Sequence, residues 1–352
     1  MKALVTERLS SKLLDKLAVL FYWAFGSIYL AQRGAEFMVR NNLPLVVSIV
    51  EYMAKTGTGT DECLKKKCLP VWVHYYQPIP EIADLEQQHV WDKISDLGGI
   101  NFQPEKQVVF LAQIGKEFGK ECSWPKNPTP DPFEFYTDNP NFSFACAAVS
   151  HSMIRKYKPR RLIEIGSGSS SCVIANALEK NLDSSSPVHY EYTIIDPYPT
   201  DRVRALAKDN VILLSERVEL QDLQMFDQLQ ENDILFIDSG HSVRTGSDVN
   251  FLILDVLPRL APGVIVHFHD IGLPYEYAKV YFTNPAFRVF WTESYLLQAF
   301  LAFNREFEVL LAVNYLMKNH RAEFCTAFPH IDTDEYRFSG SFWLRRVSKT
   351  IV

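Results

Sequence analysis

The stretch that decides the fold is Arg161-Leu-Ile-Glu-Ile-Gly-Ser-Gly-Ser-Ser-Ser171, in which a mostly apolar run is followed by two glycines and three serines. The apolar run predicts a buried strand, and the small residues after it predict a tight turn into a helix. Because glycine has no side chain to clash, such a turn lets the backbone approach a ligand closely. The stretch therefore predicts a strand, turn and helix with a binding site at the turn.

Downstream, short apolar runs alternate with helical patterns, which is typical of parallel strands covered by helices on both faces. We expect a helix over 144–157 before the first strand, then strands over 191–195, 211–214, 234–237 and 263–266, and helices over 172–179, 203–208, 246–257 and 285–303. Residues 307–315 and 341–346 resemble a terminal antiparallel pair. The pattern predicts a doubly wound α/β domain over 131–352.

Residues 1–130 have a different pattern, with helices expected over 8–56, a turn at Gly57–Gly59 and irregular, proline-rich stretches after it. The uncharged segment 17–31 is shorter than the roughly 20 residues of a spanning helix. Three interpretations remain open for it: a helix that is buried or forms a homo-oligomer interface, a peripheral membrane contact, or a targeting segment. We expect no spanning segment and a mostly helical N-terminal region.

Composition narrows the class of protein. The chain has 352 residues, of which 47% are hydrophobic and 22% charged, as in ordinary globular proteins. The net charge of −6 disfavours nucleic acid as a partner, since an acidic surface repels phosphates. The cysteines lack CxxC or zinc-type spacing, so we expect reduced thiols and a cytoplasmic location; they are Cys63, Cys68, Cys122, Cys146, Cys172 and Cys325.

The turn lacks one feature of the dinucleotide-binding fingerprint GxGxxG. Gly166 and Gly168 fit the first two glycines, but Ser171 occupies the third position. This disfavours an NAD-dependent oxidoreductase, which is kept as an alternative together with a non-catalytic binding protein. Glu164, two residues before Gly166, suits a ligand with a cationic amino-acid end, and Ser167 lies between the glycines.

Polar side chains follow every predicted strand, at the edge where doubly wound sheets bind ligands. Asp196 ends the second strand, where a carboxylate can accept hydrogen bonds from two ribose hydroxyls. Gln221 and Asp222 follow the third strand and are suitably placed for an adenine amino group. The fourth and fifth strands are followed by Asp238-Ser239-Gly240-His241 and His267-Phe268-His269-Asp270.

Together these stretches resemble class I S-adenosylmethionine-dependent methyltransferases over about 142–346. The matching text is "PRRLIEIGSGSSS", "IDP" and "DILFIDSGHSV" followed by "DVNFLILDVLPRLAPGVIVHFHDI". The branch with catechol and macrolide-sugar O-methyltransferases and cephalosporin-hydroxylase-like proteins is the most similar. The resemblance implies a Rossmann-like seven-stranded sheet with a terminal antiparallel strand. It places Glu164, Gly166 and Gly168 at the methionine end of the cofactor, Asp196 at its ribose, and Gln221 and Asp222 at its adenine.

Methyl transfer needs positioning and a deprotonated acceptor, which a general base or a divalent metal supplies. In the catechol-type relatives, acids after the fourth strand and acid–amide or acid–acid pairs after the fifth bind magnesium; Asp238, His269 and Asp270 match those positions. Histidine makes a softer metal than magnesium more suitable. Three alternatives stay open. The first is a metal-free site with His241 or His269 as the base, the second is a metal site of Asp238, His269 and Asp270 to which His241 or His267 could add a ligand, and the third is that the histidines only shape the pocket.

The acceptor is expected to be a small molecule with a hydroxyl or amine group, such as a natural product or sugar. Tyr275, Tyr277 and Trp291 follow the fifth strand and are the predicted pocket lining. Aromatic rings suit a flat acceptor, or a cation held over their faces.

Overall fold

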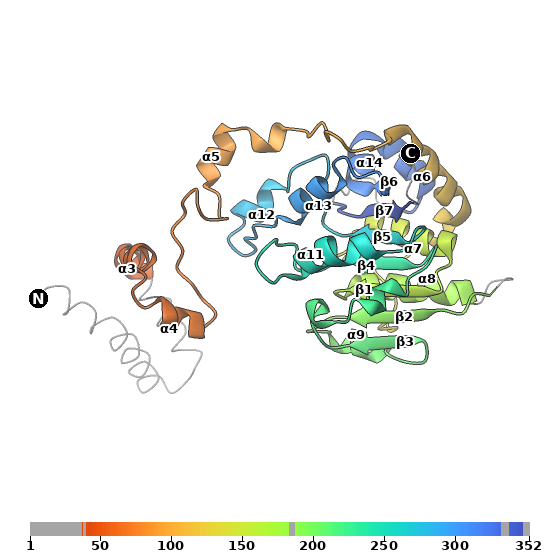
Figure 1. The fold of residues 1–352 in the computed structure, drawn as a ribbon, viewed down its shortest axis with the longest axis horizontal. Helices are drawn as coiled ribbons and strands as arrows, with labels where there is room; N and C mark the ends of the chain where they lie inside the picture. The colour runs from red at the N-terminus through yellow and green to blue at the C-terminus, as the bar shows by residue number, and fades with distance from the viewer. Residues whose placement is uncertain (1–36, 38–39, 183–186, 332–337, 348–352) are drawn as a thin grey trace, which may run out of the picture. The chain divides into compact units, whose positions relative to one another are not determined.

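The structure is a computed structural model that describes residues 37, 40–182, 187–331 and 338–347. The chain divides into two compact units, Met1–Glu81 and Ile82–Val352. The larger unit contains every described strand and every predicted site residue (Figure 1).

The larger unit is built on a seven-stranded sheet with the order β3-β2-β1-β4-β5-β7-β6. Strands β1 to β5 pair in parallel, and β7 pairs antiparallel with both β5 and β6. This is the Rossmann-like sheet with a terminal antiparallel strand that the resemblance implied. The strands are β1 (Arg161–Ile165), β2 (Glu191–Ile195), β3 (Val211–Leu214), β4 (Ile234–Ile237), β5 (Ile265–Phe268), β6 (Phe307–Ala312) and β7 (Phe342–Arg346).

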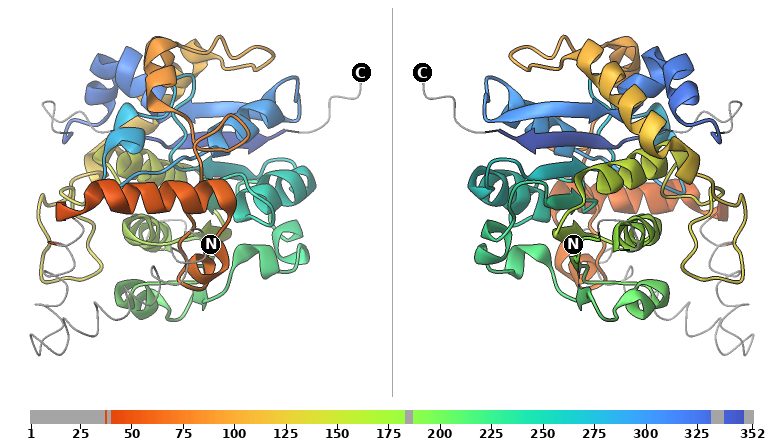
Figure 2. Two further views of the ribbon diagram at one scale, coloured as in Figure 1. Left: turned by 90° about the vertical axis from the view of Figure 1, so that its left-hand side faces the viewer. Right: turned by 90° about the vertical axis from the view of Figure 1, so that its right-hand side faces the viewer.

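Helices cover both faces of the sheet (Figure 2). One face packs against α6 (Pro104–Phe118), α7 (Phe144–Tyr157), α8 (Ser169–Leu182), α9 (Asp201–Leu206), α14 (Val313–Asn319) and α15 (Arg321–Ala327). The other packs against α10 (Gln224–Asp227), α11 (Asp248–Asn250), the π-helical turn Phe251–Val256 and α13 (Glu293–Leu301). The remaining helices of this unit are α5 (Ile82–Gln87) and α12 (Lys279–Thr283), with short 3-10 turns at Val90–Asp92, Gly119–Glu121, Val218–Leu220 and Leu257–Arg259.

The two faces follow from the alternation of side chains along β1. Leu162 belongs to the core beneath α7 and α8, whereas Ile163 and Ile165 belong to the core on the other face. The same alternation places Glu164 on the α8 side. Local signals also fix α7, since the Ser143 side chain caps it by accepting from the Cys146 N–H at 3.2 Å.

Several element boundaries differ from those predicted, most of them by a few residues. Strand β5 covers 265–268 rather than 263–266, because Gly263 has φ +91° and belongs to the preceding turn. The helix expected over 285–303 is shorter, α13 at Glu293–Leu301. Residues 307–312 form β6, but 313–315 begin α14.

The compact sheet unit begins at Ile82, well before the predicted boundary at 130/131. The physical reason is packing: Leu111 and Ile114 of α6 are buried in the sheet's core. Farther upstream, the indole N–H of Trp91 donates to the Tyr277 carbonyl at 3.1 Å, and Ser95 N–H donates to the Pro274 carbonyl at 2.9 Å. Residues 82–130 therefore complete this unit.

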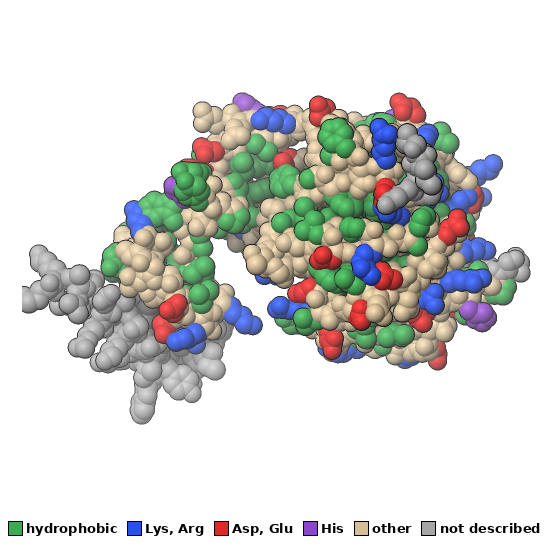
Figure 3. Space-filling view, viewed as in Figure 1, with side chains coloured by type: hydrophobic (Ala, Val, Ile, Leu, Met, Phe, Trp, Pro, Cys, Tyr) green, Lys and Arg blue, Asp and Glu red, His purple; other side chains and the backbone are tan. Residues whose placement is uncertain are grey.

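The described part of the N-terminal unit contains α3 (Leu43–Thr56) and α4 (Thr60–Lys65), joined by Gly57 and Gly59 in left-handed conformations. Hydrophobic side chains are visible on the surface of this unit in Figure 3. The exposed apolar residues of α3 are Leu43, Leu45, Val47, Ile49, Val50 and Tyr52. Among the described residues, no helix is both long and apolar enough to cross a bilayer. Segment 17–31 lies outside the described residues, and the homo-oligomer interface stays a prediction.

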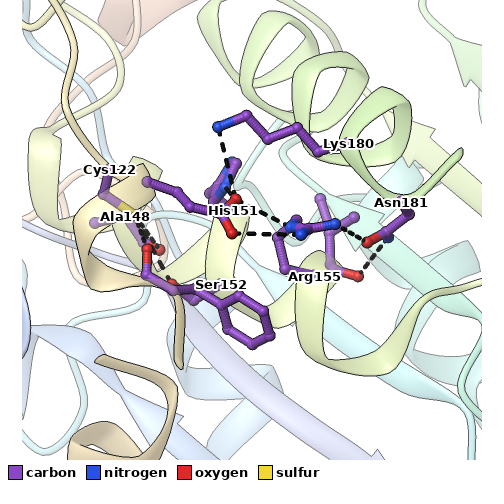
Figure 4. Close-up of polar contacts among 10 residues, drawn as sticks. Cys122, Ala148, His151, Ser152, Arg155, Lys180 and Asn181 are labelled. Carbon is purple, nitrogen blue, oxygen red and sulfur yellow. Dashed lines mark hydrogen bonds and ion pairs between the residues drawn. The ribbon is translucent and has the colours of Figure 1, made fainter. Parts of the chain in front are cut away.

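A polar network joins α7, α8 and the turn before Cys122 (Figure 4). The Glu121 carboxylate lies 3.0 Å from His151 Nε2, accepts from Arg155 Nε at 3.0 Å, and lies 3.6 Å from Lys180 Nζ. Arg155 also donates to Asn181 at 2.6 Å. Burial would raise the pKa of Glu121, but His151 and Arg155 outweigh it and lower that pKa to about 2. The network therefore holds an ionised Glu121.

We expect Glu121 to make the unit less stable in acid. Its folded pKa of about 2 lies below the unfolded value of roughly 4.3. Glu121 therefore contributes to the free energy of unfolding above its unfolded pKa, and this contribution is lost as the pH falls through its folded pKa. After allowance for solvent screening, the contribution is about 1–2 kcal/mol. Urea unfolding of wild type and Glu121→Gln at pH 7 and pH 3 measures this. The difference between them should shrink at pH 3, and an unchanged difference would contradict the role.

Candidate functional site

One cavity lies where the carboxyl ends of β1, β4 and β5 meet. Its volume is about 340 Å³, within the roughly 300–1,000 Å³ typical of small-molecule sites. Ligands of doubly wound sheets bind at this edge. The lining residues are Pro140, Asn141, Phe142, Ser167, Gly168, Ser169, Ser170, Asp238, His269, Asp270, Tyr281, Phe287 and Trp291. Ser167 and Gly168 of the glycine turn thus share one cavity with His269 and Asp270, two of the predicted catalytic residues, whereas the third, His241, is not part of the lining.

Three ligand-type side chains converge at this edge. His241 Nε2 lies 3.4 Å from Asp238 Oδ1 and 3.4 Å from Asp270 Oδ2. One ligand atom from each of the three residues lies within 4.8 Å of the others. Two carboxylates and an imidazole form a donor set that suits manganese, iron or zinc. The predicted metal set contained His269 where this cluster has His241.

His269 lies against the same two carboxylates. Its Nδ1 is 3.5 Å from Asp238 Oδ1 and 3.5 Å from Asp270 Oδ2. His241 and Asp270 have φ angles of 54° and 57°, a conformation that costs a non-glycine residue about 1–3 kcal/mol. Such strain is retained only where the surrounding structure holds it, and it clusters at functional sites.

A further carboxylate supports His241 from its other side. His241 Nδ1 lies 2.8 Å from Glu293 Oε2, and Glu293 is buried at the start of α13. The backbone carbonyl of His241 also accepts from the N–H groups of Thr292 and Glu293, at 2.9 and 3.1 Å. Glu293 was not among the predicted site residues, and its signal in the sequence is an acidic residue at the beginning of an apolar helix.

The charged side chains of the cluster shift one another's pKa values. Burial would raise the pKa of Asp238, but His269 and His241 lower it below its usual range. Burial would lower the pKa of His241, but hydrogen bonds to Asp238 and Glu293 raise it to about 10. The pKa of His269 is likewise raised, against the effect of burial, by Asp238 and Asp270. The carboxylates of Asp238 and Asp270 therefore favour positive charge on the groups that lie between them.

Glu164 has a different environment from the one predicted. Its carboxylate is fully buried and accepts from Ser170 Oγ at 2.7 Å, from Ser171 Oγ at 2.8 Å and from the Tyr192 hydroxyl. Burial raises the pKa of Glu164 to about 7, against the hydrogen bonds from Tyr192 and the serines. The side chain faces the interior beneath α8 rather than the cavity, so it holds the helix start in place.

The tip of β2 is tied to the glycine turn. The Ser167 hydroxyl donates to the Asp196 carboxylate, and Gly166 N–H donates to the Ile195 carbonyl at 2.9 Å. Gly166 has φ +78°, which glycine adopts readily. The predicted cofactor residues Ser167 and Gly168 line the cavity, and Asp196 contacts Ser167 directly.

Gln221, Asp222 and Ser239 do not line this cavity. Gln221 donates to Glu216 and to the Arg217 carbonyl within its own loop, at 3.1 and 3.3 Å. Asp222 accepts from the N–H of Gln224 at 2.9 Å and lines a different cavity over β1, β2 and β3. Their predicted contact with adenine stays a prediction, as does that of Ser239.

The predicted aromatic lining is present in part. Trp291 lines the cavity, and its ring centroid lies 4.6 Å from that of His241. Tyr277 is buried behind it and accepts from Ser294 N–H at 2.9 Å. Tyr275 is outside the lining, because its hydroxyl contacts Asn319 at 2.5 Å and its ring faces Lys318. Tyr281 and Phe287 complete the aromatic wall.

His267 belongs to the core rather than to the site. Its ring stacks on Phe236, with centroids 3.8 Å apart, and its Nε2 lies 3.0 Å from Ser341 Oγ. Burial and the charge of His269 lower the pKa of His267 well below its usual value. It is therefore neutral at pH 7.

A family of methyltransferase domains matches residues 163–271. A protein of Archaeoglobus fulgidus with no described activity is 30% identical over 170 residues, which is 46% of this chain and 74% of that protein.

Two solved structures are more distant. An SAH-bound methyltransferase of Podospora anserina, PaMTH1, is 16% identical, with a TM-score of 0.36 over 76% of this chain and 96% of that one. A SAH-bound putative protein-L-isoaspartate O-methyltransferase of Plasmodium falciparum is 13% identical, with a TM-score of 0.25 over 35% and 58% of the two chains.

Proposed function

Residues 163–271 match a family of methyltransferase domains, and we propose that this chain transfers the methyl group of S-adenosylmethionine to a hydroxyl or amine of a small molecule. The observation that carries the proposal is the cavity that Ser167 and Gly168 share with Asp238 and Asp270, two carboxylates that form a possible metal-binding cluster with His241. This arrangement supports a cofactor at the turn and an acceptor beside the cluster, within reach of each other. The modest volume and the aromatic wall favour a small, flat or sugar-like acceptor.

The cofactor would lie along the turn. Ser167 and Gly168 offer backbone groups at the start of α8, and Asp196 is positioned by Ser167 at the tip of β2. A carboxylate at that tip suits ribose hydroxyls. Tyr281, Phe287 and Trp291 offer ring faces to the sulfonium, a cation that aromatic rings attract.

The same site would hold a divalent cation through Asp238, His241 and Asp270. Nδ1 of His241 lies against Glu293 and Nε2 faces the carboxylates of Asp238 and Asp270, so positive charge is favoured at Nε2, where a divalent cation would replace the proton of the free imidazole. A divalent cation satisfies all three donors. When bound, it would lower the pKa of the acceptor group.

The reaction is a displacement on the methyl carbon. The acceptor oxygen or nitrogen forms a bond to that carbon, the carbon–sulfur bond breaks, and its electron pair stays on sulfur in the departing S-adenosylhomocysteine. His269 lines the cavity, and its Nδ1 would take the acceptor's proton when a cation bound by Asp238 and Asp270 offsets the negative charge that otherwise keeps this nitrogen protonated. Positioning and proton removal are thus the work of this chain's own residues.

Calorimetry with the full chain tests the cofactor. We expect saturable binding of S-adenosylmethionine and S-adenosylhomocysteine, and no binding of NADH, since the turn lacks the third glycine. Absence of S-adenosylmethionine binding, or tighter NADH binding, would overturn the proposal.

Metal dependence is tested separately. Titration of chelator-treated protein with Mn²⁺ should reveal one site, and methyl transfer to the responsive members of a metabolite panel should return with Mn²⁺. Full turnover in excess chelator would instead favour a metal-free site with a histidine base. The cofactor and acceptor chemistry would stand in that case.

A further inference from the structure

We propose that Glu293 is a positioning residue that holds the His241 imidazole with its proton on Nδ1 and its Nε2 toward Asp238 and Asp270. The inference rests on the role of His241 in the proposed function, and extends it to a residue beyond the cavity lining.

The geometry around His241 is specific. Its Nδ1 lies 2.8 Å from Glu293 Oε2, whereas Nε2 lies 3.4 Å from both Asp238 Oδ1 and Asp270 Oδ2. The short contact requires a proton between Nδ1 and the carboxylate, so Nδ1 is the donor. The opposite nitrogen, Nε2, then faces the two carboxylates of the site, where a bound cation would replace its proton. A carboxylate behind a metal-binding imidazole fixes the tautomer and the ring orientation in this way.

Glu293 has no comparable second role among the described residues. It is buried, and its Oε1 has no hydrogen-bond partner in the described part of the chain. A buried carboxylate with so few partners is unfavourable for folding unless its charge is compensated. His241 supplies that compensation, so the carboxylate and the imidazole form one unit.

The backbone makes this unit rigid. The His241 carbonyl accepts from the N–H groups of Thr292 and Glu293, so the loop after β4 is fastened to the start of α13. The Trp291 ring packs beside the His241 ring. The imidazole is therefore fixed at its backbone, at Nδ1 and along one side, and Nε2 is the end left for the site.

The test compares Glu293→Gln with wild type and with Glu117→Gln, the same change in an exposed ion pair with Lys156. For Glu293→Gln we expect an Mn²⁺ dissociation constant about 10–100-fold higher, a kcat at least about 100-fold lower, and little change in S-adenosylmethionine affinity. Glu293→Asp should recover part of the loss, and Glu117→Gln should match wild type. Unchanged Mn²⁺ affinity and kcat in Glu293→Gln would overturn the proposal.

A measurement on wild type covers the case in which the variant fails to fold. In Zn²⁺-loaded protein labelled with ¹⁵N-histidine, His241 should have its proton on Nδ1 and the metal on Nε2. Metal on Nδ1 would overturn the proposal. Failure of wild type to bind S-adenosylmethionine or any divalent cation would count against the proposed function instead, so the two failures are distinguishable.

Discussion

Replacing Asp238 with asparagine is expected to lower kcat by about 10³-fold or more. The carboxylate is shared by both histidines of the site, with Oδ1 3.4 Å from His241 Nε2 and 3.5 Å from His269 Nδ1. The amide keeps the size of the side chain but removes the charge that raises the pKa of both imidazoles. Cation binding and proton acceptance at His269 should therefore fail together.

The measurement is kcat at saturating S-adenosylmethionine, together with Mn²⁺ titration. A suitable control is Asp227→Asn, which removes a carboxylate paired with Arg259 at an exposed position. That control should retain wild-type turnover. If Asp238→Asn keeps turnover within about threefold of wild type, the cluster is not where the chemistry takes place.

The same cluster illustrates what the sequence could predict. Asp238, His269 and Asp270 are expected to lie close together because parallel strands end at one edge of a sheet, whereas their role as a metal-binding set is implied by the resemblance to catechol-type methyltransferases. His241 was found by the same argument from the strand ends. The His241 side chain reaches the carboxylates of Asp238 and Asp270 because the loop backbone at His241 has a positive φ. No residue pattern in that loop predicts this backbone conformation.

Glu293 shows where this reasoning ends. It follows β5 by many residues and begins a helix whose start was predicted too early, at 285 instead of 293. Its meeting with His241 depends on how α13 is fastened to the loop after β4, a long-range contact that periodicity does not encode. The sheet unit begins at Ile82 instead of residue 131 for a similar reason. The packing of α6 against the sheet is also a long-range contact that the local sequence does not predict.

Glu164 was predicted to contact the methionine end of the cofactor, but in the structure it contacts other side chains of the protein. An acid at the end of an apolar strand was expected to face a ligand, whereas its side-chain direction is set by the alternation along β1. That alternation directs it beneath α8, toward Ser170, Ser171 and Tyr192. The alternation could be read from the sequence. Which residues line the cavity at the strand ends became clear only from the fold.

Gly166→Ala is expected to be the most damaging single-methyl change in the turn. A Cβ at this position would lie 1.8 Å from the Asp238 carbonyl oxygen, and φ is +78°. The left-handed backbone and the displacement of the β4 end together cost about 2–5 kcal/mol. Urea unfolding should record that loss, and calorimetry should record loss of S-adenosylmethionine binding, because the strand end that carries Asp238 must move.

Gly168→Ala is the matched control, since it adds the same methyl group two residues away. A Cβ there meets no atom within 4 Å, and Gly168 lines the cavity. Its stability should stay within about 0.5 kcal/mol of wild type, while S-adenosylmethionine affinity falls about tenfold because the methyl group occupies space at the cofactor. The two glycines are therefore required for different reasons: Gly166 for the approach of β1 to β4, and Gly168 for the approach of the ligand. Equal loss of stability in both variants would contradict that division.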